Sequence, residues 1–425
     1  MSLPPSTGPA LPRRREILAL LFALAFLNYL DRNLLFPLLS LIGRDLHLSE
    51  AQQGMLATGF HVVYAASAPL LGFFADRLSR RQILLASLLG WSTVTALSGA
   101  AVGFYSLLLL RSLTGLGEGG YFPTALSLIG DLYGPHERGR VIALHGVCAT
   151  LGGSAGYALG GVLGAHLGWR LPFLLTVAPG LLLALLVWRR LEEPPRGSAT
   201  TGASATEPST SPATALRRPY LAIVASPAVL LMALAAASAA FAMNALNTFF
   251  PSYLEEAHRF SVASAGTLTG VFFAATLIGQ LVGGASSDLL ARRSRVARPL
   301  LVGAAYALSA VGVAALAGTP SVGLALGAYG LTQAGRGFAE PNIFGSVLDA
   351  LPAGERGTAQ GFLLMLTFAG ASASPPLVGH LKRRGGYPLA FGCAAVAAAL
   401  TSVLAFALAA WRRAGRPVEQ GGSST

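Results

Sequence analysis

The chain contains a series of apolar stretches, each about as long as a membrane-spanning helix, and they constrain its fold more than any other feature. A helix needs roughly 20 mostly apolar residues to cross a bilayer. Six such stretches lie in the first half of the chain, near 17–42, 52–75, 82–103, 105–132, 140–167 and 170–190. Six more lie in the second half, near 222–254, 262–288, 298–317, 321–349, 357–380 and 387–411. The pattern predicts an all-α membrane protein of twelve transmembrane helices in two six-helix bundles.

The composition agrees with a protein surrounded mainly by lipid. Hydrophobic residues make up 53% of the chain and charged residues only 11%, against roughly 25% charged residues in soluble domains. The formal net charge of +12 comes from short arginine clusters between apolar stretches, which argues against a basic face for nucleic acid. Cys148 and Cys393 lie far apart inside apolar stretches, so neither a disulfide framework nor a metal site is expected.

The same pattern divides the chain into five segments. We expect a cytoplasmic N-terminal segment at 1–15, a first bundle at 16–190 and a second bundle at 220–413. Residues 191–219, rich in Pro, Ser, Thr and Gly, are predicted to form a flexible cytoplasmic linker. Residues 414–425 are predicted to form a cytoplasmic tail.

The distribution of basic residues predicts the orientation in the membrane. With both termini in the cytoplasm, most of the 30 Lys and Arg residues fall on the inner side, as the positive-inside rule requires. The main exception is the run Lys382-Arg383-Arg384, which we assign to an outer loop. Arginine fills every other basic position, a usage typical of bacterial inner-membrane proteins. We therefore expect a multi-pass protein of the inner membrane, acting as a monomer.

The two halves repeat each other in sequence. GFFADRLSRR (72–81) resembles GASSDLLARR (284–293), and LTGLGEGGYFPT (113–124) resembles LTQAGRGFAEPN (331–342). DLYGPHERG, which begins at Asp131, likewise resembles the segment that begins at Asp349. Two parallel repeats of six spans, with a binding site between them, are typical of secondary transporters. The bundles are accordingly predicted to be pseudo-symmetric.

Four ionisable residues lie within predicted spans of the first half: Asp31, Arg32, Arg111 and Glu118. Each costs at least about 2.5–3.5 kcal/mol at a helix centre, so each is a candidate functional residue. Arg111 and Glu118 are about two turns apart and share a helix face. In one interpretation, Asp31–Arg111 and Arg32–Glu118, or the reverse pairing, are fixed ion pairs. In the other, at least one acid exchanges a proton during transport.

Gly115, Gly117 and Gly120 have the spacing of a dinucleotide-binding loop, but their context does not fit one. Such a loop joins a strand to a helix, whereas these glycines lie inside an apolar stretch that could cross the membrane. We interpret them as helix-packing positions around Glu118. No cofactor is expected, and no nucleophile or metal cluster indicates an enzyme.

The second half lacks most of these embedded charges. NYLDR at 28–32 becomes NALNT at 244–248, so Asn247 and Thr248 replace Asp31 and Arg32. Arg336 and Glu340 are spaced to neutralise each other on one helix. Charge handling is therefore expected in the first half, with amides and aromatic residues in the second. The predicted substrate-binding residues are Asn28, Arg32, Arg111, Tyr121, Asn244, Asn247 and Phe250.

These motifs resemble those of the major facilitator superfamily over almost the whole chain. GFFADRLSRR looks like that superfamily's loop signature between the second and third helices, which implies a latch on the cytoplasmic side. The residues that match this cytoplasmic gate are Gly72, Asp76, Arg80, Arg81, Asp131, Asp288 and Arg292.

Within that superfamily, NYLDR, RSLTGLGEGGY and EPPRG (193–197) resemble the spinster group. That group moves lysophospholipids or sphingosine-1-phosphate, and some members are regarded as proton-coupled. The resemblance implies proton coupling through Asp31, Arg32, Arg111 and Glu118, with protons and an amphipathic or anionic small molecule as partners.

Two alternatives concern the substrate and the mode of transport. The Glu-Gly-Gly-Tyr-Phe-Pro pattern at 118–123 also resembles organic anion symporters, such as those for hexuronates, and a drug exporter has the same architecture. A channel is less consistent with repeated halves and a latch, which favour alternating access.

Overall fold

The computed structural model describes residues 11–194, 226–291, 294, 296–349 and 356–414. These residues are helical almost throughout, and no strand occurs among them. Each of the twelve predicted stretches is occupied by helix within the described ranges, which confirms the predicted all-α class. The predicted N-terminal segment, linker and tail lie largely outside the described residues.

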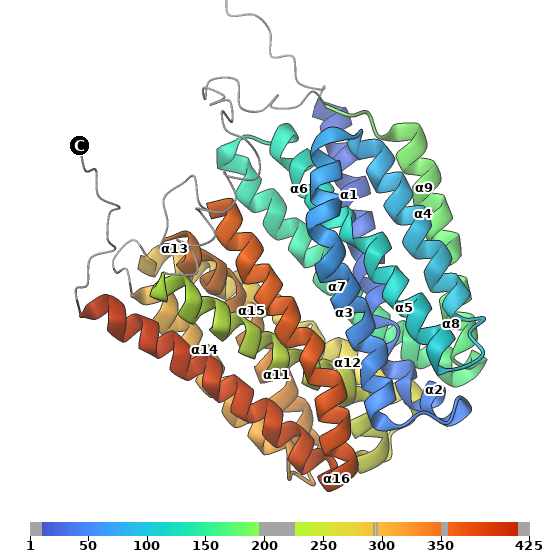
Figure 1. The fold of residues 1–425 in the computed structure, drawn as a ribbon, viewed down its shortest axis with the longest axis vertical. Coiled ribbons are helices and arrows are strands. Elements are labelled where there is room, and N and C mark those ends of the chain that lie inside the picture. The colour runs from blue at the N-terminus through green and yellow to red at the C-terminus, as the bar shows by residue number, and fades with distance from the viewer. Residues whose placement is uncertain (1–10, 195–225, 292–293, 295, 350–355, 415–425) are drawn as a thin grey trace, which may run out of the picture. The chain divides into compact units, whose positions relative to one another are not determined.

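Helices occupy most of the first half of the chain (Figure 1). In order, they are α1 (Leu11–Asn33), η1 (Phe36–Leu38), α2 (Leu39–Asp45), α3 (Glu50–Arg77), α4 (Arg80–Ser98), α5 (Phe104–Gly119), α6 (Tyr121–Leu132), α7 (Pro135–Leu167), α8 (Arg170–Leu175) and α9 (Val177–Arg190). The second half contains α11 (Pro227–His258), α12 (Val262–Phe273), α13 (Ala275–Ala291), α14 (Ala297–Leu316), α15 (Val322–Leu348) and α16 (Arg356–Arg413).

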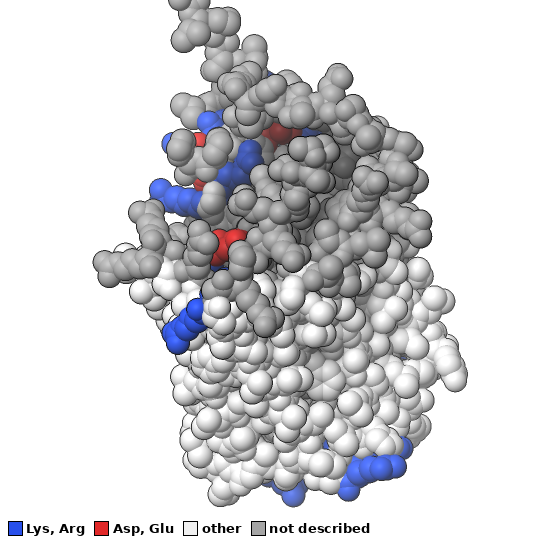
Figure 2. Space-filling model, turned by 60° about the vertical axis from the view of Figure 1, so that its left-hand side comes forward, with Lys and Arg blue, Asp and Glu red and all other residues white. Residues whose placement is uncertain are grey.

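Some predicted spans contain a break, such as the one at Gly120 between α5 and α6, whereas the last two spans share one helix. α16 covers the last two stretches and is interrupted at Gly385 and Gly386, where Gly386 has a φ of 67° that only glycine adopts readily. By length and composition, 7 of the described helical segments are long and apolar enough to cross a membrane. α5, which has 16 residues, and α15 are not among them. Figure 2 shows a broad uncharged surface, with the described charged residues near its ends.

The chain forms two compact units. Unit 1 comprises residues 1–207 and 250–271, and unit 2 comprises 208–249 and 272–425. Residues 250–271 join unit 1 because α12 touches α7 at the backbone: a Cβ on Gly266 would lie 2.6 Å from the carbonyl oxygen of Tyr157. The predicted bundle boundaries, 16–190 and 220–413, remain a prediction.

Glycines set the closest helix contacts in both units. In unit 1, α5 packs between α3 and α4: a Cβ on Gly115 would lie 2.4 Å from the oxygen of Phe60, and one on Gly117 would lie 2.8 Å from the nitrogen of Trp91. In unit 2, α13 meets α15 in the same way, with Gly279 against the carbonyl oxygen of Ala334. The structure confirms the packing interpretation of the α5 glycines and excludes a dinucleotide loop at this position.

Candidate functional site

Arg32 of α1 and Glu118 of α5 form an ion pair inside unit 1. The guanidinium donates to Glu118 Oε2 from Nη2 at 2.7 Å and from Nε at 3.1 Å. The Glu118 side chain is 0% exposed and that of Arg32 is 17% exposed. Arg32 Nη2 also donates to Asn28 Oδ1 at 3.4 Å. Of the two pairings that the sequence allowed for these residues, the structure contains Arg32–Glu118.

Aromatic rings surround the guanidinium of Arg32. Its central carbon lies 4.7 Å from the ring centroid of Tyr29, 4.6 Å from that of Phe60 and 5.3 Å from that of Tyr64. The faces of such rings attract a cation without occupying its N–H donors. Arg32 therefore combines one carboxylate partner with an aromatic wall.

Asp31 and Arg111, the other embedded charges, make no ion pair with any described residue. Asp31 is 0% exposed and Arg111 is 1% exposed. In the described part of the chain, both carboxylate oxygens of Asp31 and the Nε and Nη1 atoms of Arg111 are buried without a hydrogen-bond partner. Arg111 is nevertheless near enough for its charge to act on Asp31. Unit 1 thus contains one acid held in an ion pair and one acid, beside the Trp91 indole, that makes no ion pair with a described residue.

Tyr121 ties three helices together. Its hydroxyl group donates to the carbonyl oxygen of Leu21 at 2.8 Å and lies 2.7 Å from Nε2 of His145. Its ring packs edge-on against Trp91, with centroids 5.9 Å apart. The residue is 1% exposed, and its predicted role in substrate binding stays a prediction.

Unit 2 has a neutral cluster where unit 1 has charges. Asn247 Oδ1 accepts hydrogen bonds from the hydroxyl of Tyr329 at 3.1 Å and from Nε2 of Gln333. Extending the match of 113–124 with 331–342 by two residues places Tyr329 opposite Arg111. Asn247, which replaces Asp31, therefore contacts the residue that replaces Arg111.

The other predicted residues of the second half take different positions. Asn244 Nδ2 donates to the carbonyl oxygen of Ala371 at 2.6 Å in unit 2. Phe250 belongs to unit 1, where its ring lies 5.9 Å from that of Tyr253. The predicted Arg336–Glu340 pair is wrong, since no ion pair joins these two residues. Instead, Glu340 accepts a hydrogen bond from Gln280 at 3.5 Å, and Arg336 stands over Phe273 at 5.7 Å.

An apolar groove runs along α1, α7, α8 and α9 of unit 1. It encloses about 520 Å³ and is lined mainly by aliphatic and aromatic side chains, among them Phe26, Leu30, Leu34, Leu159 and Leu182. The break between α8 and α9 at Thr176 lies on its wall. Leu30 and Leu34 flank the charged pair of α1 in sequence, but none of the four embedded charged residues lines the groove.

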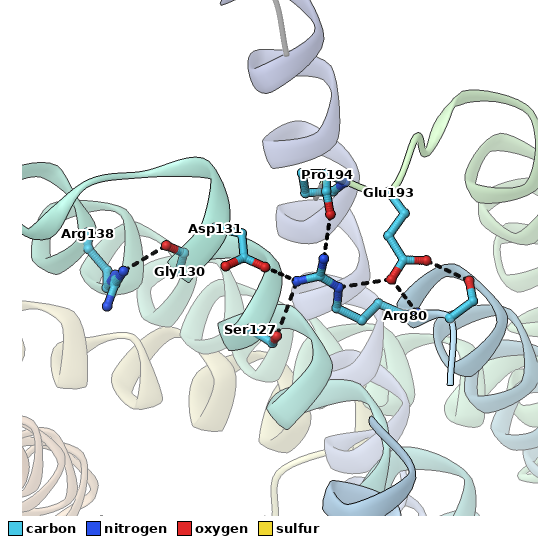
Figure 3. A network of polar contacts seen from close by, with 8 residues as sticks. Arg80, Ser127, Gly130, Asp131, Arg138, Glu193 and Pro194 are labelled. Carbon is cyan, nitrogen blue, oxygen red and sulfur yellow. Dashed lines mark hydrogen bonds and ion pairs between the residues drawn. The ribbon is translucent and has the colours of Figure 1, made fainter. Parts of the chain in front are cut away.

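Arg80 organises a separate network at the start of α4 (Figure 3). The residue is 1% exposed. Its guanidinium is ion-paired with Asp131, donates to Glu193 Oε1 from Nε at 3.1 Å and donates to the carbonyl oxygen of Pro194 at 2.6 Å. Ser127 Oγ accepts a further bond at 3.3 Å. The network joins α4, the end of α6 and the segment after α9.

Glu193 is a functional candidate that the sequence reasoning missed. Burial raises the pKa of its carboxyl group, but hydrogen bonds from Ser79, from the Arg80 backbone and from the Arg80 side chain together lower this pKa below its ordinary value. Glu193 is the first residue of the EPPRG segment, which the sequence analysis used only as a sign of resemblance to the spinster group.

The remaining predicted gate residues are only partly described. Arg81 donates to the carbonyl oxygen of Trp188. The backbones of Gly72, Asp76 and Asp288 lie in α3 and α13, but the side chains of Asp76 and Asp288, like the whole of Arg292, lie outside the described residues.

Unit 2 repeats part of the Arg80 network. Asp349, which matches Asp131 in the repeat, is ion-paired with Arg298 at 2.5 Å. Arg298 lies in the first turn of α14, as Arg80 lies in the first turn of α4.

Curated relatives include two kinds of transporter. The hexuronate transporter of Bacillus subtilis (strain 168) is 29% identical over 65% of this chain and 65% of its own length. Spinster homolog 1 of Xenopus tropicalis is 30% identical over 60% of this chain and 48% of its own length. The sphingosine-1-phosphate transporter SPNS2 of Danio rerio is 27% identical over 67% and 59%. The chain thus spans about half to two thirds of the length of these relatives.

Solved structures give the same fold. A bacterial homologue of the human lysosomal transporter spinster, in an inward-facing and unoccupied conformation, superposes with a TM-score of 0.78 at 24% identity, covering 95% of this chain and 97% of that one. The family model described as Major Facilitator Superfamily matches residues 21–375 and 232–424. The chain therefore belongs to the Major Facilitator Superfamily of transporters, and within it resembles the spinster proteins.

Proposed function

We propose that this transporter couples proton movement to the transport of a lysolipid or sphingolipid-like amphipath by alternating access. The observation that carries the proposal is the contrast between the two acids of unit 1. Glu118 is held in an ion pair by Arg32, whereas Asp31 is buried beside the Trp91 indole and makes no ion pair with any described residue. A lone buried charge is costly in a membrane-spanning unit, so Asp31 is the better candidate for gaining and losing a proton.

Proton binding and anion binding are linked through Arg111. When Asp31 carries a proton, the positive charge of Arg111 loses one of the two acids, Glu118 and Asp31, whose charges act on it. The Nε and Nη1 donors of Arg111, which have no partner among the described residues, then suit a phosphate or carboxylate. Loss of the proton restores the negative charge at Asp31 and weakens the hold on the anion. Proton and substrate therefore occupy the site together, as in a symporter.

The amphipathic substrate is supported by the walls of the site. Tyr29, Phe60 and Tyr64 surround Arg32, and an apolar groove of about 520 Å³ follows α1. A site that has a charged residue at one end and apolar walls suits a molecule with one anionic group and one hydrocarbon chain. The likeness to spinster homologues and to a sphingosine-1-phosphate transporter points the same way.

A second candidate is a proton-coupled hexuronate-like organic anion symporter. It is favoured by the relative named as a hexuronate transporter, which matches 65% of this chain. It uses the same arginines and the same acid, and differs only in lacking a hydrocarbon chain on the substrate.

We further propose an inner-membrane monomer with both termini in the cytoplasm. In this orientation the Arg80 network, with Asp131 and Glu193, lies at the cytoplasmic end of unit 1 and forms part of the gate. The clustering of basic residues next to the predicted inner segments supports this assignment.

Proton flux into liposomes tests the proposed function. Purified protein is reconstituted with an internal pH-sensitive dye, and sphingosine-1-phosphate, lysophosphatidylcholine or glucuronate is added outside. Flux with a lipid, absent in Asp31→Asn, supports the main proposal. Flux with glucuronate alone supports the second candidate. Equal flux in wild type and Asp31→Asn would refute coupling through Asp31.

A further inference from the structure

Arg336 lies midway along α15 in unit 2, and its charge has no counter-ion among the described residues. It makes neither an ion pair nor a hydrogen bond with any of them. Its guanidinium carbon lies 5.7 Å from the ring centroid of Phe273, a contact that does not occupy the N–H donors of the group. A charged residue inside a membrane span is costly, so Arg336 is a candidate functional residue.

The sequence repeat places Arg336 where unit 1 has Glu118. Glu118 is held by Arg32, and the residue of the second half that matches Arg32 is Thr248. The charge at this position of the repeat is therefore reversed, while the residue that matches its partner carries no charge.

Glu340 lies about one turn further along α15 and also makes no ion pair with any described residue. Its carboxylate accepts a hydrogen bond from Gln280 Nε2 of α13 at 3.5 Å, which is long for such a bond. Arg336 and Glu340 are both only partly buried, so each side chain reaches open space. Two opposite charges thus lie on one helix without pairing with each other.

Both charges lie on the face of α15 that is turned towards α11. Positions 329, 333, 336 and 340 follow one face of a helix. Tyr329 and Gln333, at the start of this series, both donate to Asn247 Oδ1 of α11. Leu331, on the opposite face, is 42% exposed. The two charges therefore extend, along the same helix face, the neutral cluster that replaces the charges of unit 1.

We propose that Arg336 and Glu340 together bind a zwitterionic headgroup, with its phosphate on Arg336 and its ammonium group on Glu340. This inference rests on the proposed function and narrows its substrate to an amphipath that carries both charges. A guanidinium group holds a phosphate through two parallel N–H···O bonds, and a carboxylate accepts hydrogen bonds from an ammonium group. The headgroup completes both ion pairs at once, which accounts for two opposite charges that do not pair with each other.

The same two residues distinguish the two substrate classes considered above. Sphingosine-1-phosphate and lysophosphatidylcholine each carry a phosphate and a positively charged nitrogen. Glucuronate carries a carboxylate alone, so a glucuronate bound at Arg336 leaves a second negative charge close by at Glu340. Like charges at close range repel, and such repulsion selects against the wrong ligand. Glu340 therefore favours the lipid over the organic anion.

Binding of lipids that each lack one charge to the purified transporter tests the inference. Sphingosine-1-phosphate carries both charges, lysophosphatidic acid carries the phosphate alone and sphingosine carries the ammonium group alone. The variants are Arg336→Gln and Glu340→Gln, which remove the charge and keep a polar side chain. Arg384→Gln, at an exposed arginine of unit 2, is the control. Thermal melting without ligand checks that each variant is folded.

We expect Arg336→Gln to weaken binding of sphingosine-1-phosphate and lysophosphatidic acid about tenfold. Its effect on sphingosine should be less than about twofold. Glu340→Gln should weaken binding of sphingosine-1-phosphate and sphingosine about tenfold. Lysophosphatidic acid should bind to this variant at least as well as to wild type, because a like charge has been removed. The control should resemble wild type with all three lipids.

Three results would overturn the inference, and they are distinguishable. Wild-type affinity for sphingosine-1-phosphate in either variant would refute the paired headgroup site and leave the proposed function intact. An equal loss for all three lipids in one variant would make that residue structural. A wild type that binds glucuronate but none of the three lipids would refute the lipid substrate and this inference with it.

Discussion

Unit 1 and unit 2 carry the same repeat but place different chemistry at matching positions. In unit 1, α1 carries Asp31 beside Arg111, and neither makes an ion pair with a described residue. In unit 2, α11 carries Asn247, which accepts hydrogen bonds from Tyr329 at 3.1 Å and from Gln333. The glycine contacts between neighbouring helices are retained in both units, at Gly115 against Phe60 and at Gly279 against Ala334.

The difference indicates a division of labour between the units. A satisfied neutral cluster stabilises one helix arrangement, because each buried polar group left without a partner costs about 1–3 kcal/mol. The unsatisfied charges of unit 1 are retained at a cost in stability, which is typical of groups that change partners during function. We infer that proton chemistry belongs to unit 1 and helix positioning to the amide cluster of unit 2.

The largest effect is expected from Asp31→Asn. Without the ionisable group of Asp31, accumulation of substrate driven by a pH gradient should fall to background. Exchange of labelled for unlabelled substrate, which needs no net proton movement, should persist. Counterflow and gradient-driven uptake are measured in the same liposomes. If Asp31→Asn still accumulated substrate, the assignment of proton chemistry to this acid of unit 1 would be wrong.

Glu118→Ala should have the next largest effect, on stability as well as transport. It leaves the partly buried Arg32 guanidinium without its counter-ion, and loss of one partner costs up to about 3–5 kcal/mol when an ion pair is fully buried. Glu118→Gln, which still accepts a hydrogen bond, should cost less. Thermal melting in detergent gives the comparison, and equal melting of wild type and Glu118→Ala would contradict the buried pair.

Asn247→Ala tests unit 2 at the position that matches Asp31. It removes the acceptor for both Tyr329 and Gln333, so we expect a loss of stability of about 1–3 kcal/mol. The number of protons moved per substrate should stay as in wild type. A changed proton stoichiometry in Asn247→Ala would place proton chemistry in unit 2 and refute the division.

The smallest effect is expected outside the membrane, at Glu193. Hydrogen bonds from Ser79 and Arg80 lower its folded-state pKa below the ordinary value of 4.5, so their stabilisation is complete above about pH 4.5. It is lost as the pH falls through the lowered pKa. Glu193→Gln should therefore cost less than about 1 kcal/mol near neutral pH. Its melting curve should meet that of wild type in acid; a constant difference down to the lowest pH would exclude this carboxylate as the cause.

Much of the fold was predictable because the length and hydrophobicity of a segment identify it as a membrane span. The twelve stretches and the packing role of the α5 glycines follow from local sequence, and the structure confirms both. The loop between the last two spans is shorter than predicted, because α16 continues through Lys382 and breaks at Gly385 and Gly386.

The partners of charged residues were less predictable. Asp31 and Arg32 are adjacent, and Arg111 and Glu118 share one helix face, so sequence spacing permits either pairing. Only the rotation of α1 against α5 selects Arg32–Glu118. Arg336 and Glu340 have the correct spacing for a pair, yet Gln280 and Phe273 from α13 and α12 contact them instead. Tertiary neighbours outweigh a spacing rule that contributes only about 0.2–0.5 kcal/mol.

Proton exchange on substrate binding tests the central claim most directly. The purified transporter, in weakly buffered detergent solution with a pH indicator, is mixed with sphingosine-1-phosphate or glucuronate, and the same is done with Asp31→Asn and Asn247→Ala. The account predicts a proton change on binding in wild type and in Asn247→Ala, and none in Asp31→Asn although it still binds. A proton change of wild-type size in Asp31→Asn would contradict the assignment of proton coupling to this acid of unit 1.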